Sequence, residues 1–283
     1  MNKILVTGAS GNVGREVVKE LRRLQQSVVA TAVNEVDAGL IPGVGAEIVH
    51  FEFGQAETYP AAFNGVRKLF LMRPPAIADV ERYLFPVLDY AEHAGVEHIA
   101  FLSVIGVNRR MPHYQVEKRL AAGRVPYTCL RPGFYMQNLN TQYREDIRLR
   151  NEIFVPAGRG KTGFIDVRDI GAAAAKVLTE NGHTNRAYAL TGSEALNYYQ
   201  VADLLTQALG RTITYRKPSP QEYGRHMRAR GIDEQFLQVL QGLYKPIRWR
   251  LGGKVTTEFN QLIGRAPIKM RQYIQDYASN WSV

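Results

Sequence analysis

The sequence Thr7-Gly8-Ala9-Ser10-Gly11-Asn12-Val13-Gly14 joins an apolar run, residues 3–7, to a segment with helical spacing, residues 15–24. A pyrophosphate group needs free backbone N–H donors and the positive end of a helix dipole. Glycine allows the sharp turn and the close approach of the phosphates, and the third glycine lets the helix pack near the strand. The position between a first strand and a first helix favours a dinucleotide site over a tight turn that binds nothing. The residues expected to hold the cofactor here are Thr7, Gly8, Ser10, Gly11, Asn12, Val13 and Gly14.

The rest of the first half alternates apolar runs with helical patterns. Strands are expected at residues 3–7, 27–33, 47–51, 68–72, 98–102 and 126–130, and helices at 15–24, 79–94 and 113–122. Gly95 ends the second of these helices, as glycine commonly does. Continuous apolar strands that alternate with helices predict a parallel sheet covered on both faces. The fold class is therefore α/β, a Rossmann-type doubly wound sheet that binds ligands beyond the carboxyl ends of its strands.

The pattern changes after about residue 150. Residues 151–163 are rich in Gly, Pro, Lys and Arg, which suggests an exposed loop, and residues 164–167 suggest a short strand returning to the main body. Helices are expected at 169–178 and 197–209, a short strand at 212–215, and mostly helix from residue 218 onward. The expected NAD(P)-binding domain covers 1–155 with returning segments near 164–178 and 185–215. Residues 216–283 with 156–163 are expected to form a small, mostly helical lobe that covers the substrate.

Composition limits the classes of function. The chain has 283 residues, 45% of them hydrophobic, a formal net charge of +10 and one cysteine. The chain contains no run of about 18 apolar residues, so no membrane helix is expected. Because the sequence enters a strand at once, no signal peptide is expected either. The single cysteine, Cys129, favours a reducing, cytoplasmic setting. The dispersed basic residues favour a solvated surface over nucleic-acid binding. No metal site is expected, and a homo-oligomer is possible.

Several motifs together resemble one family. Beside TGxSGxxG at the N-terminus, the supporting stretches are residues 101–106 (FLSVIG), 125–139 (VPYTCLRPGFYMQNL), 164–170 (FIDVRDI), 178–183 and 188–192. They resemble the atypical short-chain dehydrogenase/reductases, and within these the NmrA-like branch that includes triphenylmethane reductase-like proteins. The resemblance covers about 215 residues well. It implies an NAD(P)H-dependent oxidoreductase that reduces a small, flat or aromatic acceptor, quinone- or dye-like. Some NmrA-like proteins are instead regulators that bind the cofactor and a protein partner without chemistry, and that alternative stays open.

The choice between NADP and NAD depends on the residues that follow the second strand. A 2′-phosphate prefers an arginine or lysine there, whereas NAD usually pairs its ribose hydroxyls with an acidic residue. Many NmrA-like proteins have an Arg-Asn pair at this point, and here the pair reads Val33-Asn34. Glu35 and Asp37 follow without a placement that indicates NAD. Arg15 on the first helix could reach a 2′-phosphate, or it is a surface charge of that helix. The resemblance favours NADP, with NAD as the other possibility.

Other cofactor contacts are expected at the ends of the later strands. Phe53 is expected near the adenine, or packed in the core. Met72 and Arg73 follow the fourth strand, where Arg73 could meet a phosphate or an acidic substrate, or cap the proline turn. The segment after the sixth strand is expected either to face the nicotinamide or to pack in the core: Pro132, Gly133, Phe134, Tyr135, Met136 and Asn138.

The catalytic residues have more than one interpretation. Ser103, Tyr114 and Lys118 resemble the serine, tyrosine and lysine of typical short-chain dehydrogenases, in which the YxxxK spacing places both side chains on one helical face. His113 and Glu117 form an overlapping pair with the same spacing, and a histidine could donate a proton near neutral pH. A third possibility is that no side chain acts as acid or base and that hydride transfer depends on proximity alone.

Overall fold

The computed structural model describes residues 2–41 and 45–282 and groups them into two compact units. The first unit comprises residues 1–132, 167–190 and 258–265, and the second comprises residues 133–166, 191–257 and 266–283.

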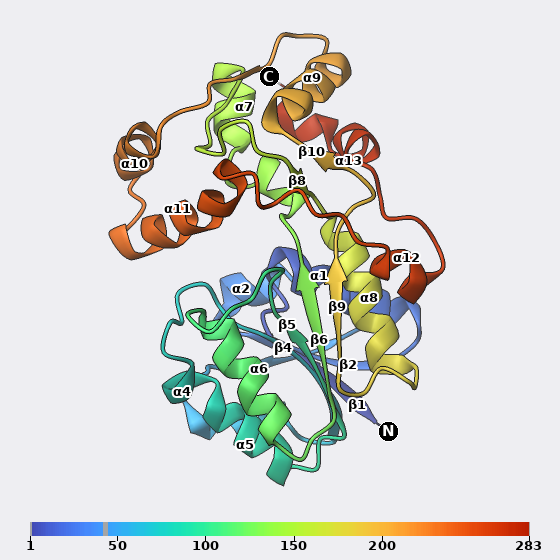
Figure 1. The fold of residues 1–283 in the computed structure, drawn as a ribbon. Coiled ribbons are helices and arrows are strands. Elements are labelled where there is room, and N and C mark those ends of the chain that lie inside the picture. The colour runs from blue at the N-terminus through green and yellow to red at the C-terminus, as the bar shows by residue number, and fades with distance from the viewer. Residues whose placement is uncertain (1, 42–44, 283) are drawn as a thin grey trace. The chain divides into compact units, whose positions relative to one another are not determined.

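The first unit is built on a seven-stranded sheet with the order β3-β2-β1-β4-β5-β6-β9, in which every neighbouring pair is parallel (Figure 1). The order reverses between β1 and β4, which confirms the predicted doubly wound Rossmann topology. The six predicted strands are all present, and a seventh, β9, adds to the edge beyond β6. The strands are β1 Lys3–Val6, β2 Ser27–Ala32, β3 Glu47–His50, β4 Val66–Met72, β5 His98–Leu102, β6 Tyr127–Pro132 and β9 Arg186–Leu190.

Helices cover both faces of this sheet. On one face, α1 and α8 pack against each other. Gly171 permits their close approach, because a Cβ at this position would lie only 2.8 Å from the backbone carbonyl carbon of Glu16. On the other face, helices α3 to α6 bury a large apolar cluster that includes Phe101 and Val116. The helical elements of the unit are α1 Asn12–Arg23, α2 Glu35–Gly39, η1 Ala56–Thr58, α3 Tyr59–Ala62, α4 Val80–Tyr83, α5 Phe85–His93, α6 Pro112–Ala122, α8 Val167–Thr179 and α12 Glu258–Ile263.

The single helix predicted over residues 79–94 is wrong, because the structure divides it into α4 and α5 at Leu84. Pro86 lies in the first turn of α5, where its missing N–H needs no acceptor. In one continuous helix the same proline would leave the carbonyl of Arg82 without its donor. The predicted end at Gly95 is confirmed, since that glycine has a φ of +76°.

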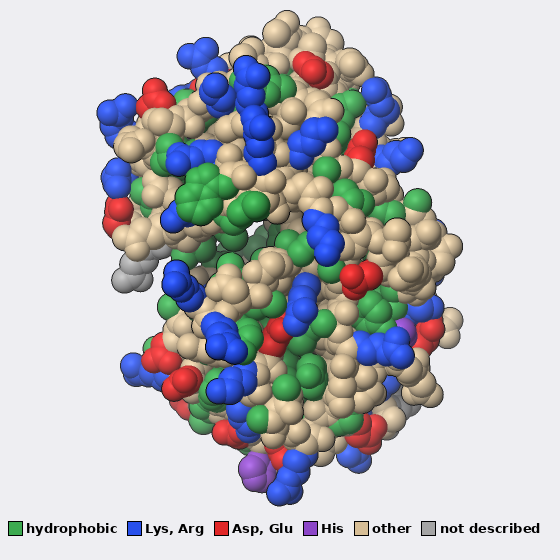
Figure 2. Space-filling model, in the orientation of Figure 1, with side chains coloured by type: hydrophobic (Ala, Val, Ile, Leu, Met, Phe, Trp, Pro, Cys, Tyr) green, Lys and Arg blue, Asp and Glu red, His purple; other side chains and the backbone are tan. Residues whose placement is uncertain are grey.

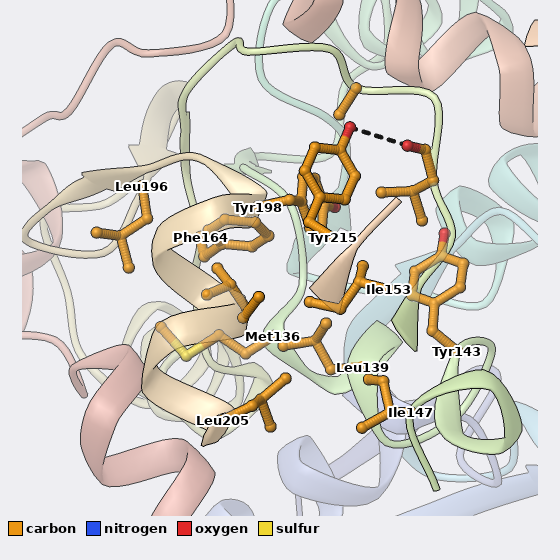
Figure 3. Packing of buried hydrophobic residues seen from close by; sticks show 14 of the residues in the cluster. Met136, Leu139, Tyr143, Ile147, Ile153, Phe164, Leu196, Tyr198, Leu205 and Tyr215 are labelled. Atoms are coloured by element: carbon orange, nitrogen blue, oxygen red, sulfur yellow. Dashed lines mark hydrogen bonds between the residues drawn. The ribbon is translucent and has the colours of Figure 1, made fainter. Parts of the chain in front are cut away.

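The second unit packs short helices and strands around an aromatic and aliphatic core (Figure 3). Tyr215 lies in this core and donates a hydrogen bond to the carbonyl of Val155 at 3.0 Å, drawn as a dashed line. The mostly helical character predicted after residue 218 is confirmed. The elements are η2 Met136–Leu139, α7 Arg144–Arg150, β7 Glu152–Ile153, β8 Thr162–Gly163, β10 Ala195–Leu196, α9 Tyr198–Leu209, β11 Thr214–Tyr215, α10 Pro220–Ala229, α11 Glu234–Arg248, α13 Met270–Asp276 and η3 Ala278–Trp281.

Two sequence predictions fail in the second unit. The exposed loop expected at 151–163 is wrong, because Ile153, Val155 and Ala157 are fully buried and the segment contains β7 and β8. The alternation of buried positions is that of an extended chain with one face in a core. The short strand expected at 164–167 is also wrong: Ile165 makes only an isolated bridge with Tyr135, and the return to the first unit begins with α8.

Within the described residues, no helix is both long and apolar enough to cross a membrane.

Candidate active site

The glycine-rich loop lies between β1 and α1, at the point where the strand order reverses. Gly8 has a φ of +62°, a conformation that disfavours any residue with a side chain. A Cβ on Gly8 would lie 2.6 Å from the sulfur of Met72, and a Cβ on Gly14 would lie 2.1 Å from the carbonyl oxygen of Gly8. The loop therefore excludes side chains at two of its three glycines, and Gly14 brings the helix directly against the loop.

The N-terminus of α1 is suited to an anion. Gly11 is the N-cap residue and supplies no capping side chain, and no acidic residue occupies the first turn of the helix. Gly11 donates its N–H to the carbonyl of Gly8 at 3.0 Å, which closes the turn. The next N–H groups of the helix have no intrahelical acceptor, and the helix dipole adds positive potential there. These features fit a dinucleotide pyrophosphate.

Thr7 holds the loop to the neighbouring strand. Its hydroxyl donates to the carbonyl of Phe70 at 3.1 Å and accepts the N–H of Met72 at 2.9 Å, and the residue is fully buried. The side chain of Thr7 therefore ties β1 to β4 and positions the glycines that follow.

The end of β2 carries no basic residue. Val33 is 48% exposed and donates its N–H to the carboxylate of Asp37 at 3.2 Å, while Asn34 caps α2 by accepting the N–H of Asp37 at 2.8 Å. Arg15, on the first turn of α1, donates to the Asn12 side chain at 3.2 Å. Beyond β3, half-buried Phe53 packs edge-on against Phe51, with ring centroids 5.2 Å apart. The Phe53 ring therefore packs in part against the core.

Arg73 turns back on the segment that follows β4. Its guanidinium donates to the carbonyls of Pro74 at 3.0 Å and Ile77 at 2.5 Å. These contacts match the expected capping of the proline turn. Burial, together with the charge of Arg73, lowers the pKa of His113 to about 4. His113 is therefore neutral at pH 7.

Ser103 follows β5 and is part of a hydrogen-bonded group that the sequence analysis missed. Its hydroxyl donates to Oε1 of Glu117 on α6 at 2.6 Å. Arg131 on β6 donates to both oxygens of the same carboxylate, from Nε at 2.9 Å and from Nη2 at 2.5 Å. Burial, aided by the Glu117 carboxylate, raises the pKa of the Cys129 thiol to about 12, so the thiol stays protonated. The carboxylate thus joins β5, α6 and β6.

The structure does not bring Tyr114 and Lys118 into this group. Lys118 is exposed, and Tyr114 is half-buried. In the part of the chain that the structure describes, no side-chain hydrogen bond or ion pair joins either residue to a partner. The helix turns by about 100° between successive residues, so the pair lies beside, and not on, the stripe that carries Glu117.

The residues after β6 that were expected to contact the cofactor are divided between the two units. Pro132 is the last residue of β6, whereas Gly133 begins the second unit. Phe134 packs against Tyr244, with ring centroids 5.2 Å apart, and Met136 is 1% exposed within the core of the second unit. Core packing therefore explains Met136.

Comparisons with known proteins agree with this fold. The model of the NmrA-like family matches residues 1–247. An NAD(P)H azoreductase from Xenophilus azovorans is 31% identical over 247 residues, which cover 85% of this chain and 86% of that protein. An NADPH-dependent quinone oxidoreductase from Escherichia coli, solved with NADPH, has a TM-score of 0.85 and 25% identity, with 97% of this chain and 99% of that chain covered. The triphenylmethane reductase of Citrobacter sp., solved with NADP(H), shares the fold with a TM-score of 0.82 and 24% identity, with 98% of this chain and 99% of that chain covered. The chain belongs to the NmrA-like family.

Proposed function

We propose that this protein is an NAD(P)H-dependent reductase of a small, flat acceptor such as a quinone or an azo or triphenylmethane dye. The observation that carries the proposal is the loop before α1, in which a Cβ on Gly14 would lie 2.1 Å from a backbone oxygen of Gly8. Such a loop offers backbone N–H groups and a helix start to a pyrophosphate. Relatives named as an azoreductase and a quinone oxidoreductase support the choice of acceptor.

The cofactor preference is proposed to be NADP, with NAD as the alternative to be tested. The neighbouring structures solved with NADPH and NADP(H) support this preference. In this chain, Arg15 is the cation on the first turn of α1, and its present bond to Asn12 is a single contact of 3.2 Å that a 2′-phosphate could replace. The carboxylate of Asp37, in the first turn of α2, repels a phosphate, so the preference for NADP is expected to be modest. The residues proposed to hold the cofactor remain Gly8, Ser10, Gly11, Asn12, Val13, Gly14, Arg15, Val33, Asn34, Phe53, Met72, Arg73, Ser103, Pro132, Gly133 and Phe134, with Thr7 acting through the loop.

We propose that catalysis depends on positioning and uses no dedicated side-chain acid. A reduced nicotinamide, when bound, supplies the hydride, and the chain's own residues bind and orient it. Lys118 is exposed, Ser103 already donates its only hydroxyl hydrogen, and His113 is neutral at pH 7. A hydroquinone or reduced dye can take its proton from water.

The test is steady-state oxidation of NADPH and NADH in the presence of a panel of quinones and azo dyes, followed by loss of reduced-nicotinamide absorbance. Turnover that depends on the acceptor and saturates with it supports the reductase. Cofactor binding without turnover for any acceptor would instead favour a regulator that senses the cofactor.

We also propose a covering role for the second unit's segments, a possible homo-oligomer and the absence of nucleic-acid binding. The substrate-covering role of residues 156–163 and 216–283 can be tested by acceptor protection of these segments in hydrogen exchange. Homo-oligomerisation can be tested by light scattering. The absence of nucleic-acid binding is supported by Lys and Arg side chains that are dispersed among acidic and neutral ones on the face seen in Figure 2.

A further inference from the structure

Ser103 lies where the second half of a dinucleotide would rest. A doubly wound sheet binds one mononucleotide over each half, across the point where the strand order reverses. The glycine loop and β2 belong to the half that takes the adenosine, so the nicotinamide nucleoside falls to the half made of β4, β5 and β6. Ser103 directly follows β5, the central strand of that half.

The Ser103 hydroxyl already donates its hydrogen to Glu117. It points to Oε1 of Glu117 at 2.6 Å, and Ser103 is only 3% exposed, so water competes little for it. Glu117 cannot turn away, because Arg131 binds both of its oxygens. A serine hydroxyl has one hydrogen and two lone pairs. A ligand can therefore bind Ser103 only by donating a hydrogen bond to a lone pair of its hydroxyl oxygen. The bond to the Glu117 carboxylate polarises the hydroxyl and makes this oxygen a stronger acceptor.

We propose that Ser103 is a hydrogen-bond acceptor for the carboxamide N–H of the nicotinamide, and that Glu117, fixed by Arg131, is the positioning residue that keeps it so. This assignment is the opposite of a serine that donates to a substrate carbonyl. It rests on the proposed function, because it requires that a nicotinamide cofactor binds.

Two cofactor analogues isolate the N–H group. The acetylpyridine analogue of NADP replaces the amide nitrogen with a methyl group, whereas the thionicotinamide analogue keeps the nitrogen and changes the oxygen to sulfur. The Kd of each is measured by calorimetry, so the readout does not depend on turnover. The wild-type protein should bind the acetylpyridine analogue about threefold to tenfold more weakly than the thionicotinamide analogue, the value of one net hydrogen bond.

Variants test which residues cause the preference for the thionicotinamide analogue over the acetylpyridine analogue. Ser103→Ala should bind both analogues equally, and Ser103→Thr, which keeps the hydroxyl, should restore the preference. Glu117→Ala removes the acceptor that holds the serine hydrogen, so the hydroxyl can donate as well as accept, and the ratio of the two Kd values should fall toward one. Gln115→Ala, exposed on the same helix, is the matched control and should behave as wild type.

The outcomes separate the inference from the proposed function. If the wild-type protein binds neither NADP nor either analogue, the proposed function fails. If it binds NADP but prefers neither analogue, or if Ser103→Ala keeps the full preference, the inference is overturned while the proposed function stands. Should Glu117→Ala fail to fold, as judged by circular dichroism, the two serine variants still decide.

Discussion

Replacing Gly14 with alanine adds one methyl group at the tightest contact of the loop. The added Cβ would lie 2.1 Å from the carbonyl oxygen of Gly8 and 2.9 Å from Cα of Ala9, and both partners are backbone atoms that no rotamer change can move. To reach ordinary van der Waals contact at about 3.5 Å, the start of α1 must separate from the loop by roughly 1.4 Å. That shift breaks the alignment of the N–H groups that we propose bind the pyrophosphate.

Two magnitudes follow from the shift. Overpacking of this kind costs about 1–3 kcal/mol of the free energy of unfolding. At about 2–4 °C per kcal/mol for a unit of this size, Tm should fall by about 2–12 °C. One lost hydrogen bond to a charged group contributes about 1.5–3 kcal/mol, so the Kd for NADPH should rise at least tenfold, to about a hundredfold.

The assay is calorimetric titration of NADPH into folded protein, with Tm measured by calorimetry on the same samples. Gly39→Ala is the matched control, because Gly39 lies in α2 and a Cβ there meets no atom within 4 Å. The control should bind NADPH as wild type does and be as stable or slightly more stable. If Gly14→Ala binds NADPH with wild-type affinity, the assignment of the loop to the pyrophosphate is refuted.

Other residues of the first unit provide three further tests. Tyr114→Phe and Lys118→Ala should each keep kcat within about threefold of wild type, whereas a loss of about a hundredfold would identify a side-chain acid. Burial lowers the pKa of His98 and His113 to about 4, so the unfolded chain takes up protons at these sites as pH falls from 6.5 toward 4 while the folded chain does not. The two histidines therefore leave the free energy of unfolding unchanged above pH 6.5 and lower it below that pH. The Tm of His98→Asn should fall less steeply than that of the wild type as the pH is lowered from 6.5 to 4, and equal slopes for the two proteins would contradict this. Thr7→Val, which removes both side-chain bonds to β4, should lower stability by about 1–3 kcal/mol in denaturant titration, and Thr7→Ser should not; equal stability of the two variants would argue against the role given to the hydroxyl.

The parallel sheet could be predicted because its strands are buried on both faces and read as continuous apolar runs. β4 and β5 begin and end within two residues of the prediction for this reason. β9 was missed as a strand because it has two alanines and no β-branched residue, and its first residues, Arg186 and Ala187, are exposed in the structure. Its place in the sheet depends on pairing with β6, more than 50 residues earlier in the chain, and local pattern carries no such information.

The errors in the second unit have a similar cause. β7 pairs with β11, at Glu152 with Thr214, and strands of two residues leave almost no periodic signal. The alternation of Ile153, Val155 and Ala157 was nevertheless visible, and the Gly, Pro and Lys around it outweighed it in the prediction of an exposed loop. Turn-forming residues mark where a chain bends, but burial depends on whether alternate positions are apolar.

The register of α6 shows what the sequence could have decided about the candidate site. Tyr114 with Lys118 and His113 with Glu117 have the same spacing, and their motifs differ by a single residue, so spacing alone cannot choose between them. The apolar positions can: Val116 and Leu120 are buried, and together with His113 and Glu117 they follow the i, i+3, i+4, i+7 pattern of one helical face. The polar pair that lies on the same helical face as Val116 and Leu120 must point toward the sheet. Only Glu117 then reaches the end of β5, and its partner Arg131, on another strand, could be identified from the structure alone.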